Sequence, residues 1–420
     1  MAVTTATPST ARLDARTAPP LRVQLRRAER ARKRNAILLI APLLLFLLIT
    51  FLIPIAQVLF RSIENPEVVE TMPNLATAID SWDGRELPPP AIVAAFAADL
   101  AAARDNKTVT RAAKRLNYSI PGYRSLLIKT ARRLPPPDTP DLLAALAKID
   151  KRWADRAYWT VLKRASTAHT LEYLLAAADL TYDTDGAVVE KPDHSAIYMT
   201  VLARTLWIAV AVTVLCLLLG YPIAYLLATL PTKYSNLLLL LLLLPFWTSL
   251  LVRTTAWVVL LQNQGVVNDL GIWLGLWNEP LQLVRNRTGV YIAMVHIMLP
   301  FMVLPLFSVM KGISPYHLKA AASLGASPLR AFLKVYAPQT LPGIGAGTLL
   351  VFIMTLGFYI TPALVGGPKD QMLSYFIAFN AGTTVNWGMA AALSLMLMVC
   401  VCVFFAVYSR LIGVNNLRLG

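Results

Sequence analysis

Six long runs of apolar residues divide the chain, and each is long enough to cross a lipid bilayer as a helix. A hydrocarbon core of about 30 Å requires roughly 20 consecutive apolar residues in an α-helix. We therefore predict membrane spans at residues 36–60, 200–230, 237–261, 290–310, 342–365 and 388–408. This pattern predicts an all-α, polytopic membrane protein with six transmembrane helices.

The first apolar run follows a strongly basic segment. Residues 1–34 contain nine Lys and Arg residues and only two acids, so we predict a disordered cytoplasmic tail there. The run within residues 35–61 exceeds the roughly 7–15 apolar residues of a signal peptide and continues past Pro54. We expect an uncleaved first transmembrane helix. Six spans would then return residues 413–420 to the cytoplasm as a short tail.

Residues 62–197 differ completely in character from the apolar runs. They hold 18 of the 23 acids and 17 bases, and helical spacing is found at residues 91–104, 108–116, 141–164 and 171–180. Asp138 or Thr139 before Pro140 is a typical helix start. We predict a helical periplasmic insert, because long loops are translocated regardless of charge. A flexible charged loop is the alternative.

Composition and charge support this topology. Hydrophobic residues make up 56% of the chain and charged residues only 15%, against about 25% in a soluble domain, which makes an ordinary cytosolic enzyme improbable. The net charge is +16, and the predicted inner loops are basic, with no acid anywhere from residue 280 to 369. The predicted outer loops carry Asp269, Glu279 and Asp370. This asymmetry agrees with the positive-inside rule.

The loop at residues 311–342, between the fourth and fifth spans, has the pattern of two short helices. Ser314 and Ser327 can cap helix N-termini, each followed by a proline at the first helical position. Gly325 stands where the first helix must end with positive φ, and Pro338 is expected to stop the second helix. We predict a helix pair that projects into the cytoplasm and offers a partner the small residues Ala320 and Ala321. A simple basic linker is the alternative.

This loop resembles the cytoplasmic EAA loop of the inner-membrane permeases of binding-protein-dependent ABC importers, in particular the first permease of spermidine/putrescine-like systems. The resemblance is carried by Ala320, Ala321, Gly325, Pro338 and the following Pro342-Gly343-Ile344. Lys319 stands where the family usually has glutamate, and Gly388 follows Trp387 where proline is common. Further matches extend over residues 200–410: Thr205-Leu206-Trp207, Gly220-Tyr221-Pro222, Leu244 to Ser249, Arg253 to Trp257, Leu299 to Pro305, and Gly366-Gly367.

The resemblance implies a type I ABC importer-like fold, with the permease core at residues 198–412, in a bacterial inner membrane. It implies that Lys319, Ala320, Ala321, Gly325, Arg330 and Pro338 belong to the loop that docks on an ATPase. The implied partners are two ATPase subunits, a second and homologous permease, a periplasmic binding protein and the lipid bilayer, with no nucleic acid. The implied substrate is a small organic cation such as a polyamine. Another small organic ion, or a membrane-anchored sensor or scaffold, is the alternative.

Three residues of the third span are candidates for the translocation pathway: Trp247, Arg253 and Trp257. A charge inside a span is costly and marks a functional candidate, although Arg253 can also extend to the lipid headgroups. The tryptophans can equally be interfacial residues. Prolines in successive spans favour a pathway that moves. A short amphipathic helix is predicted at residues 266–277, just after this span.

The sequence offers no catalytic chemistry. It contains no Gly-rich run ending in Gly-Lys-Ser/Thr, so we expect ATP to be bound by partner subunits. The four histidines and three cysteines are dispersed without metal-ligand spacing, and no catalytic or metal site is expected. We therefore expect a transport subunit and no enzyme.

Overall fold

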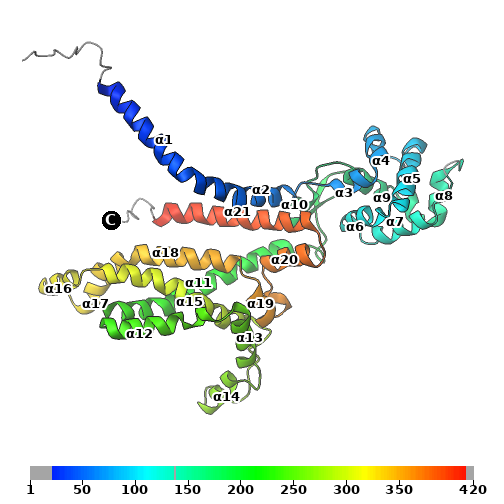
Figure 1. Ribbon diagram of the computed structural model, residues 1–420. Helices are drawn as coiled ribbons and strands as arrows, with labels where there is room; N and C mark the ends of the chain where they lie inside the picture. The colour runs from blue at the N-terminus through cyan, green and yellow to red at the C-terminus, as the bar shows by residue number, and fades with distance from the viewer. Residues whose placement is uncertain (1–20, 137–138, 413–420) are drawn as a thin grey trace, which may run out of the picture. The chain divides into compact units, whose positions relative to one another are not determined.

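The computed structural model describes residues 21–136 and 139–412, and the chain divides into two units, Met1–Val58 and Leu59–Gly420. The first unit is helical throughout its described part, with α1 (Leu21–Leu47), the π-helical turn η1 (Leu48–Leu52) and α2 (Ile53–Phe60), which runs into the second unit (Figure 1). The stretch Arg32–Phe60 is long and apolar enough to cross a membrane, as predicted. The predicted C-terminal tail, residues 413–420, lies outside the described residues, as do residues 1–20 of the predicted N-terminal tail 1–34.

The prediction of a disordered tail is wrong for residues 21–34, because α1 already begins at Leu21. Ala, Leu, Arg and Lys are good helix formers, and extending an existing helix avoids the cost of nucleation. Pro54 does not interrupt the span. The N–H of Ile53 bonds to the carbonyl of Leu48, five residues back, and this widened turn accommodates the proline that follows.

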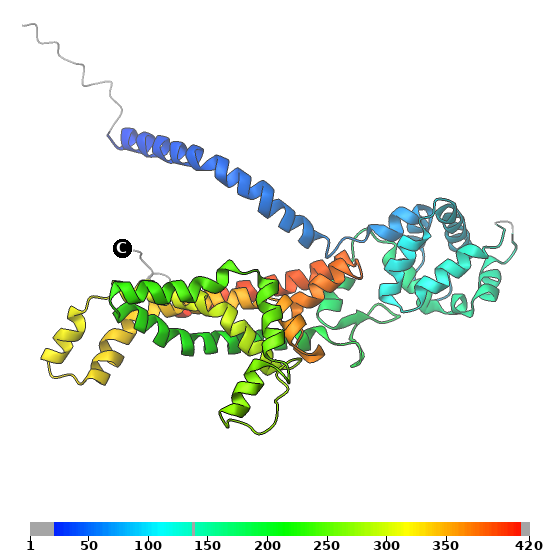
Figure 2. The ribbon, with the colours of Figure 1, turned by 60° about the horizontal axis from the view of Figure 1, so that its bottom comes forward.

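The membrane core in the second unit consists of long helices and the short elements between them (Figures 1 and 2). Its elements are α11 (Tyr198–Thr229), α12 (Thr232–Leu243), η4 (Leu244–Trp247), α13 (Leu250–Leu260), α14 (Val266–Trp273), α15 (Arg287–Gly312), α16 (Tyr316–Ser323), α17 (Pro328–Ala331), η5 (Phe332–Tyr336), α18 (Ala337–Leu356), α19 (Ile360–Val365), η6 (Pro368–Asp370), α20 (Leu373–Gly382) and α21 (Trp387–Ile412). Among the described residues of the whole chain, five helices qualify as membrane spans, or six if one bent pair is counted.

The core is centred on α11, α15 and α18, which pack closely along their length. Glycines permit this approach. A Cβ atom at Gly347 would lie 2.8 Å from Sδ of Met302, and one at Gly220 would lie 3.0 Å from Cγ of the same methionine. Gly343 packs in the same way against the backbone of α15 at Leu306. Small residues at helix contacts are what membrane packing requires, because lipid supplies no hydrophobic force between helices.

Two predicted spans are not single straight helices. The third, at 237–261, is broken: Thr232–Trp247 and Leu250–Leu260 meet at 98°. Pro245 lies in the 3₁₀ turn before the break, and the hydroxyl of Ser249 accepts a hydrogen bond from the N–H of Val252 to start a new helix. The fifth, at 342–365, is divided into α18 and the separate α19.

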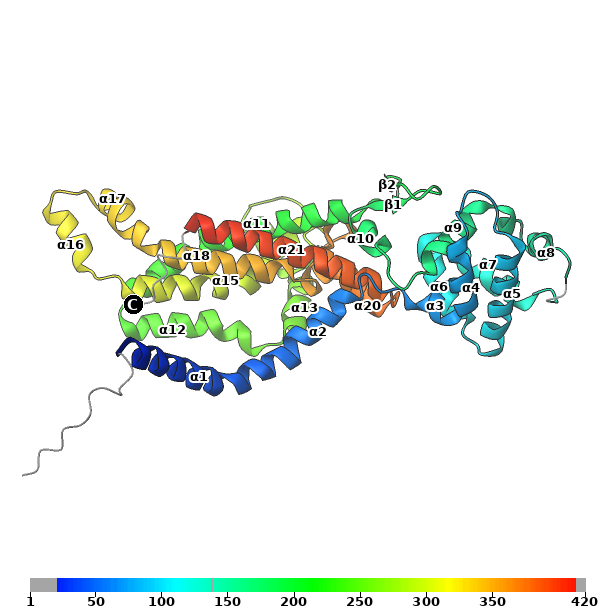
Figure 3. The ribbon, with the colours of Figure 1, turned by 90° about the horizontal axis from the view of Figure 1, so that it is seen from above.

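The insert is a folded helical domain, so the alternative of a flexible loop is wrong. Its elements, seen in Figure 3, are α3 (Pro66–Thr71), α4 (Pro73–Ala78), η2 (Ile79–Ser81), α5 (Pro90–Asp105), α6 (Val109–Ser119), α7 (Tyr123–Arg132), α8 (Leu142–Ile149), η3 (Lys151–Ala154), α9 (Arg156–Ala165), α10 (Glu172–Ala177), β1 (Leu180–Tyr182) and β2 (Val188–Glu190). The two strands pair antiparallel. Phe96, Trp153 and Trp159 form a fully buried aromatic centre, with ring centroids 4.9–5.3 Å apart.

Two details of the predicted insert are corrected. The helix expected over 141–164 is interrupted between α8 and α9, because Asp150 and Asp155 each cap a new helical turn with the carboxylate. The helix start is Asp141, which accepts a hydrogen bond from the N–H of Ala144, in place of Thr139. The other suggested start, Asp138, lies outside the described residues.

A buried charge network joins α6 to α10. The side chain of Arg115 is only 1% exposed and lies 2.8 Å from the Glu172 carboxylate, which also accepts from Arg164 at 3.3 Å. Burial alone would raise the pKa of Glu172, but the charges of Arg115 and Arg164 outweigh burial and lower it. The guanidinium of Arg115 also donates to Oδ1 of Asn65, next to the start of α3. This network therefore links the beginning and the end of the insert.

The insert is fixed to the core at the ends of α11 and α21. The Asp179 carboxylate accepts hydrogen bonds from the N–H groups of Tyr198 and Met199 at 3.0 and 2.8 Å, at the start of α11. At the start of α21, a Cβ atom on Gly388 would lie 2.3 Å from the ring of Tyr173. Gly388, which stands where the resembled family commonly has proline, thus leaves the space that the ring of Tyr173 occupies.

Candidate functional site

The turn in the first half of the predicted coupling loop has the geometry that the sequence indicated, whereas the helix starts differ from the prediction. Pro315, in place of Ser314, is the N-cap of α16, and the hydroxyl of Ser327 makes no cap hydrogen bond. Gly325 has φ of +81°, and its N–H bonds to the carbonyl of Ala322 while the N–H of Ala326 bonds to that of Ala321. This pair of bonds is a Schellman motif, which ends α16 and redirects the chain. Ser327 then occupies the N-cap of α17, with Pro328 at the first helical position.

The second half differs from the prediction, because Pro338 does not stop the helix. The segment Pro328–Leu356 forms one helix of 29 residues. The N–H of Ala337 bonds to the carbonyl of Phe332, five residues back, so a π-helical turn directly precedes Pro338. The wider turn removes the need for the N–H that proline lacks. The loop is therefore one short helix followed by the direct extension of a membrane helix.

Aromatic packing holds the base of this extension against α11. The ring of Phe332 lies 5.7 Å from that of Tyr225 and 6.3 Å from that of Tyr221, both edge to face. Tyr336 also packs on Tyr225 at 5.4 Å and is 5% exposed. Edge-to-face contacts at these distances are favourable. The helix pair, which projects beyond the long helices in Figure 2, thus rises from a packed base.

The tip of the pair is apolar and exposed. The exposed fractions are 73% for Tyr316, 89% for Leu324, 68% for Leu329 and 57% for Leu333. Sequence reasoning missed these four residues, although apolar side chains in a loop expected to lie in water are a usable signal. We define these four residues as the apolar tip.

The residues that the sequence did single out lie in the same loop and at the start of α18. Lys319, Ala320, Gly325, Arg330 and Pro338 are exposed, and Ala321 is half-buried. The ammonium of Lys319 lies 5.6 Å from the ring centre of Tyr316, so the base at the usual glutamate position covers one face of an apolar-tip residue.

The three pathway candidates lie around the break between α12 and α13. The guanidinium of Arg253 donates to the carbonyl of Thr248 at 3.1 Å and lies 5.7 Å from the ring centre of Phe246. Arg253 thus satisfies a backbone carbonyl that the break leaves free. Its Nε has no partner among the described residues. Arg253 accordingly supports the bend itself.

The two tryptophans differ in environment. Trp247 is 76% exposed, whereas the indole N–H of Trp257 donates to Nδ1 of His296 at 3.1 Å. His296 on α15 is a partner that sequence reasoning missed. The hydroxyls of Thr254 and Thr361 lie 3.1 Å apart and attach α13 to α19. The structure therefore brings Arg253 and Trp257 onto one fixed helix and leaves Trp247 apart.

Within residues 21–136 and 139–412, no group of three His, Cys, Asp or Glu side chains is placed to hold a metal ion. The features present are a protruding apolar tip and a bent helix pair beside a tightly packed helix bundle.

Comparison with known proteins adds a family to this geometry. The family described as "Binding-protein-dependent transport system inner membrane component" matches residues 217–413, which leaves the insert outside the match. The spermidine/putrescine transport system permease protein PotB of Escherichia coli (strain K12) is 38% identical over 214 residues, covering 51% of this chain and 78% of that protein. The inner membrane ABC transporter permease protein YdcU of the same strain is 33% identical over 225 residues, covering 50% and 71%.

Among solved structures, a bacterial ABC transporter involved in the import of the acidic polysaccharide alginate has a chain with 18% identity and a TM-score of 0.42, covering 51% of this chain and 79% of that chain. The sequence relatives confirm the family resemblance. The chain belongs to the family of binding-protein-dependent transport system inner membrane components and is a multi-pass, inner-membrane permease subunit of an ABC importer.

Proposed function

We propose that this chain forms half of a translocation pathway for a small organic cation such as a polyamine, with ATP hydrolysed by two separate ATPase subunits. The observation that carries the coupling role is the apolar tip on its packed base. Four large apolar side chains exposed together on a short projecting element mark a docking surface. The ATPase would bind there, with Lys319, Ala320, Ala321, Gly325, Arg330 and Pro338 around it, and the tip would be cytoplasmic, as would both termini.

The substrate class rests on the relatives. A protein 38% identical to this chain is named a spermidine/putrescine permease. The predicted spans contain no Asp or Glu to attract a dication, while Arg253 carries a positive charge. Aromatic faces such as that of Trp247 would have to attract the cation in place of carboxylates, at about 0.5–2 kcal/mol per cation–π contact. Selection would then reside in a periplasmic binding protein, and another small organic ion is the alternative.

One chain supplies only part of an alternating-access pathway, so a second permease is required. We favour a homologous chain without the insert. The insert would then stand on one side of the assembly only and would brace the binding protein asymmetrically. A particle that contains two identical copies of this chain would refute the heterodimer.

The docking role can be tested by Leu324→Asp in the full chain, co-expressed with its proposed ATPase and sister permease. Leu324 is 89% exposed, so the substitution should leave the chain folded while the ATPase no longer co-purifies. Val188→Asp in the insert hairpin, at a residue 52% exposed, is the matched control and should leave co-purification unchanged. Equal ATPase recovery from wild type and Leu324→Asp would refute docking at the tip.

The substrate is tested separately, in proteoliposomes that contain the whole importer and its binding protein. Labelled spermidine or putrescine should accumulate with ATP. No binding of either polyamine by the binding protein would refute the polyamine assignment and leave the coupling role untouched.

A further inference from the structure

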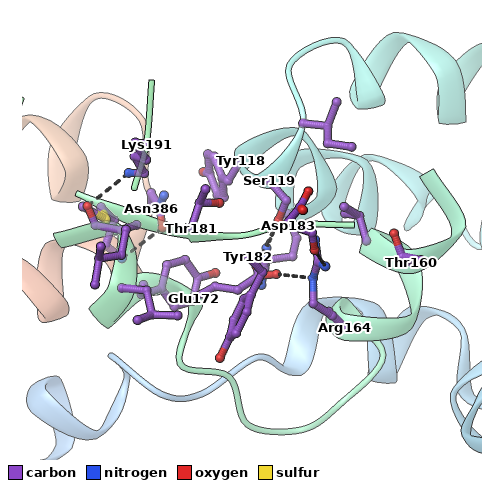
Figure 4. A pocket seen from close by; sticks show the side chains of 18 of the residues that line it. Tyr118, Ser119, Thr160, Arg164, Glu172, Thr181, Tyr182, Asp183, Lys191 and Asn386 are labelled. Carbon is purple, nitrogen blue, oxygen red and sulfur yellow. Dashed lines mark hydrogen bonds and ion pairs between the residues drawn. The ribbon is translucent and has the colours of Figure 1, made fainter. Parts of the chain in front are cut away.

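A cavity of about 430 Å³ lies at the junction of the insert and the core. The insert supplies walls such as Tyr118, Glu172 and Tyr182, and the core supplies Tyr198 and Asn386. Figure 4 shows these insert side chains and Asn386 gathered around one space. A ligand in this cavity would therefore touch both parts of the chain at once.

Two carboxylates, Glu172 and Asp183, and three basic side chains, Arg115, Arg164 and Lys191, line the cavity. One oxygen of Glu172 accepts from Arg115 at 2.8 Å and from Ser119 at 3.0 Å, and the other accepts from Arg164 at 3.3 Å. The two guanidinium groups therefore outweigh the charge of Glu172 and leave it little capacity to bind a cationic ligand.

Most of the other side-chain acceptor oxygens of the wall are also occupied. Oδ1 of Asn386 accepts from the N–H of Met389 at 3.1 Å, and Oδ1 of Asn380 accepts from the hydroxyl of Thr384 at 3.2 Å. Oδ1 of Asp183 accepts from the backbone N–H of the next residue at 2.6 Å, while its Oδ2 has no partner among the described residues. Most of the side-chain acceptors in the wall are thus occupied by groups of the protein, with Oδ2 of Asp183 as the exception.

Donors, in contrast, remain available. The hydroxyl of Tyr182, a residue of the cavity wall, makes no hydrogen bond within the described residues. The ammonium of Lys191 can donate three hydrogen bonds but makes one, to the carbonyl of Ala176 at 3.1 Å. Burial lowers the pKa of Lys191, and the charge of the nearby Asp179 opposes this shift.

Most of the tyrosine rings of the cavity are already in contact with a cation, with Tyr118 as the exception. Three of them already face a cation of the protein, with the charge 5.0–5.6 Å from the ring centre. The pairs are Arg115 with Tyr173, Arg164 with Tyr182, and Lys191 with Tyr198. A cationic ligand such as a polyamine would meet like charges and covered rings.

We propose that this cavity binds a small anion through carboxylate or phosphate oxygens, and that the bound anion fastens the insert to the core. Such oxygens accept hydrogen bonds only, which matches a wall with spare donors and spent acceptors. The site is separate from the translocation pathway and does not depend on the transported substrate.

Binding is measured by isothermal titration of the full chain in phosphatidylcholine nanodiscs, with inorganic phosphate and with succinate as probes. At least one probe should bind saturably at one site per chain. Lys191→Gln and Tyr182→Phe should each weaken that binding at least tenfold, and the second variant retains the ring that faces Arg164. Lys148→Gln, at an exposed lysine of α8, is the matched control and should leave the affinity unchanged.

A lipid headgroup can supply the same oxygens, and a second arm separates the two sources. In phosphatidylglycerol nanodiscs a headgroup ligand would block the titration, and native mass spectrometry should find one retained phosphatidylglycerol on the wild type and none on Lys191→Gln. The proposal is overturned if no probe binds saturably and no lipid is retained, or if both variants bind as the wild type does.

Discussion

Replacement of Glu172 by glutamine tests how much the buried charge network contributes to the insert. The change keeps the shape of the side chain, removes its charge and replaces one acceptor oxygen by an NH2 group. Arg115, with 1% of its side chain exposed, would then lose its hydrogen-bonded counter-charge and keep only the charge of Glu67 nearby. Breaking a buried ion pair from one side costs about 3–5 kcal/mol, and the remaining amide oxygen places the expected loss near the lower limit, about 3 kcal/mol.

Hydrogen exchange of the full chain in detergent measures this loss locally. About 3 kcal/mol corresponds to roughly 100-fold faster exchange in peptides from α6 and α10, if they exchange through opening of the insert. Peptides from α15 should not change. Glu70→Gln is the control, because Glu70 pairs with Arg111 where both side chains are about half exposed. This change should alter the free energy of opening, measured by exchange, by less than about 1 kcal/mol.

The pH dependence follows from the sign of the pKa shift. Folding lowers the pKa of Glu172, so its contribution is complete above the unfolded pKa and is lost as the pH falls through the folded pKa. The difference between wild type and variant, corrected for intrinsic exchange, should shrink in that acidic range. Equal exchange for Glu172→Gln and Glu70→Gln near neutral pH would show that Arg115 does not depend on this carboxylate.

Three further substitutions have specific expected outcomes. Gly325→Val forces a β-branched residue to φ of +81°, costs more than about 1 kcal/mol and should abolish uptake but not membrane insertion, whereas Gly312→Val, in open space without positive φ, should transport normally. Gly388→Ala places a methyl group 2.3 Å from the Tyr173 ring and should speed proteolysis of the insert in the full chain. Unchanged cleavage would contradict the close packing of this ring on Gly388. Arg253→Met removes the bond to the Thr248 carbonyl and should speed exchange at residues 246–252 roughly tenfold, while exchange at wild-type rates would mean that the bend holds itself.

The sequence predicted those features that depend on local rules. Hydropathy located the long helices, and the turn at Gly325 followed from the residue type that positive φ favours. The break at Thr248 and Ser249 was missed because a hydropathy window averages over a cap of one residue, although Pro245 and Ser249 together carried a signal. The continuation through Pro338 was missed because the rule that proline ends a helix takes no account of a π-helical turn before it.

Features that pair distant residues were beyond sequence reasoning. Nothing local indicates that Gly388 receives the ring of Tyr173, or that Trp257 bonds to His296. The apolar tip is visible in the sequence as Tyr316 and three leucines within a basic loop, but the sequence does not indicate that these side chains stay exposed. The roles of Lys319, Arg330 and the other loop residues stay predictions until the docking experiment is done.

The helix Pro328–Leu356 continues without a break from the predicted coupling loop into the membrane core. At 1.5 Å per residue it is about 43 Å long, and its close contacts with α15 at Gly343 and Gly347 lie near its middle. The segments on either side of Gly343 measure about 22 and 20 Å, so a tilt of about 5° about this point would move each end by about 2 Å in opposite directions. Because Phe332 and Tyr336 pack against Tyr225, such a tilt requires α11 to move together with this helix.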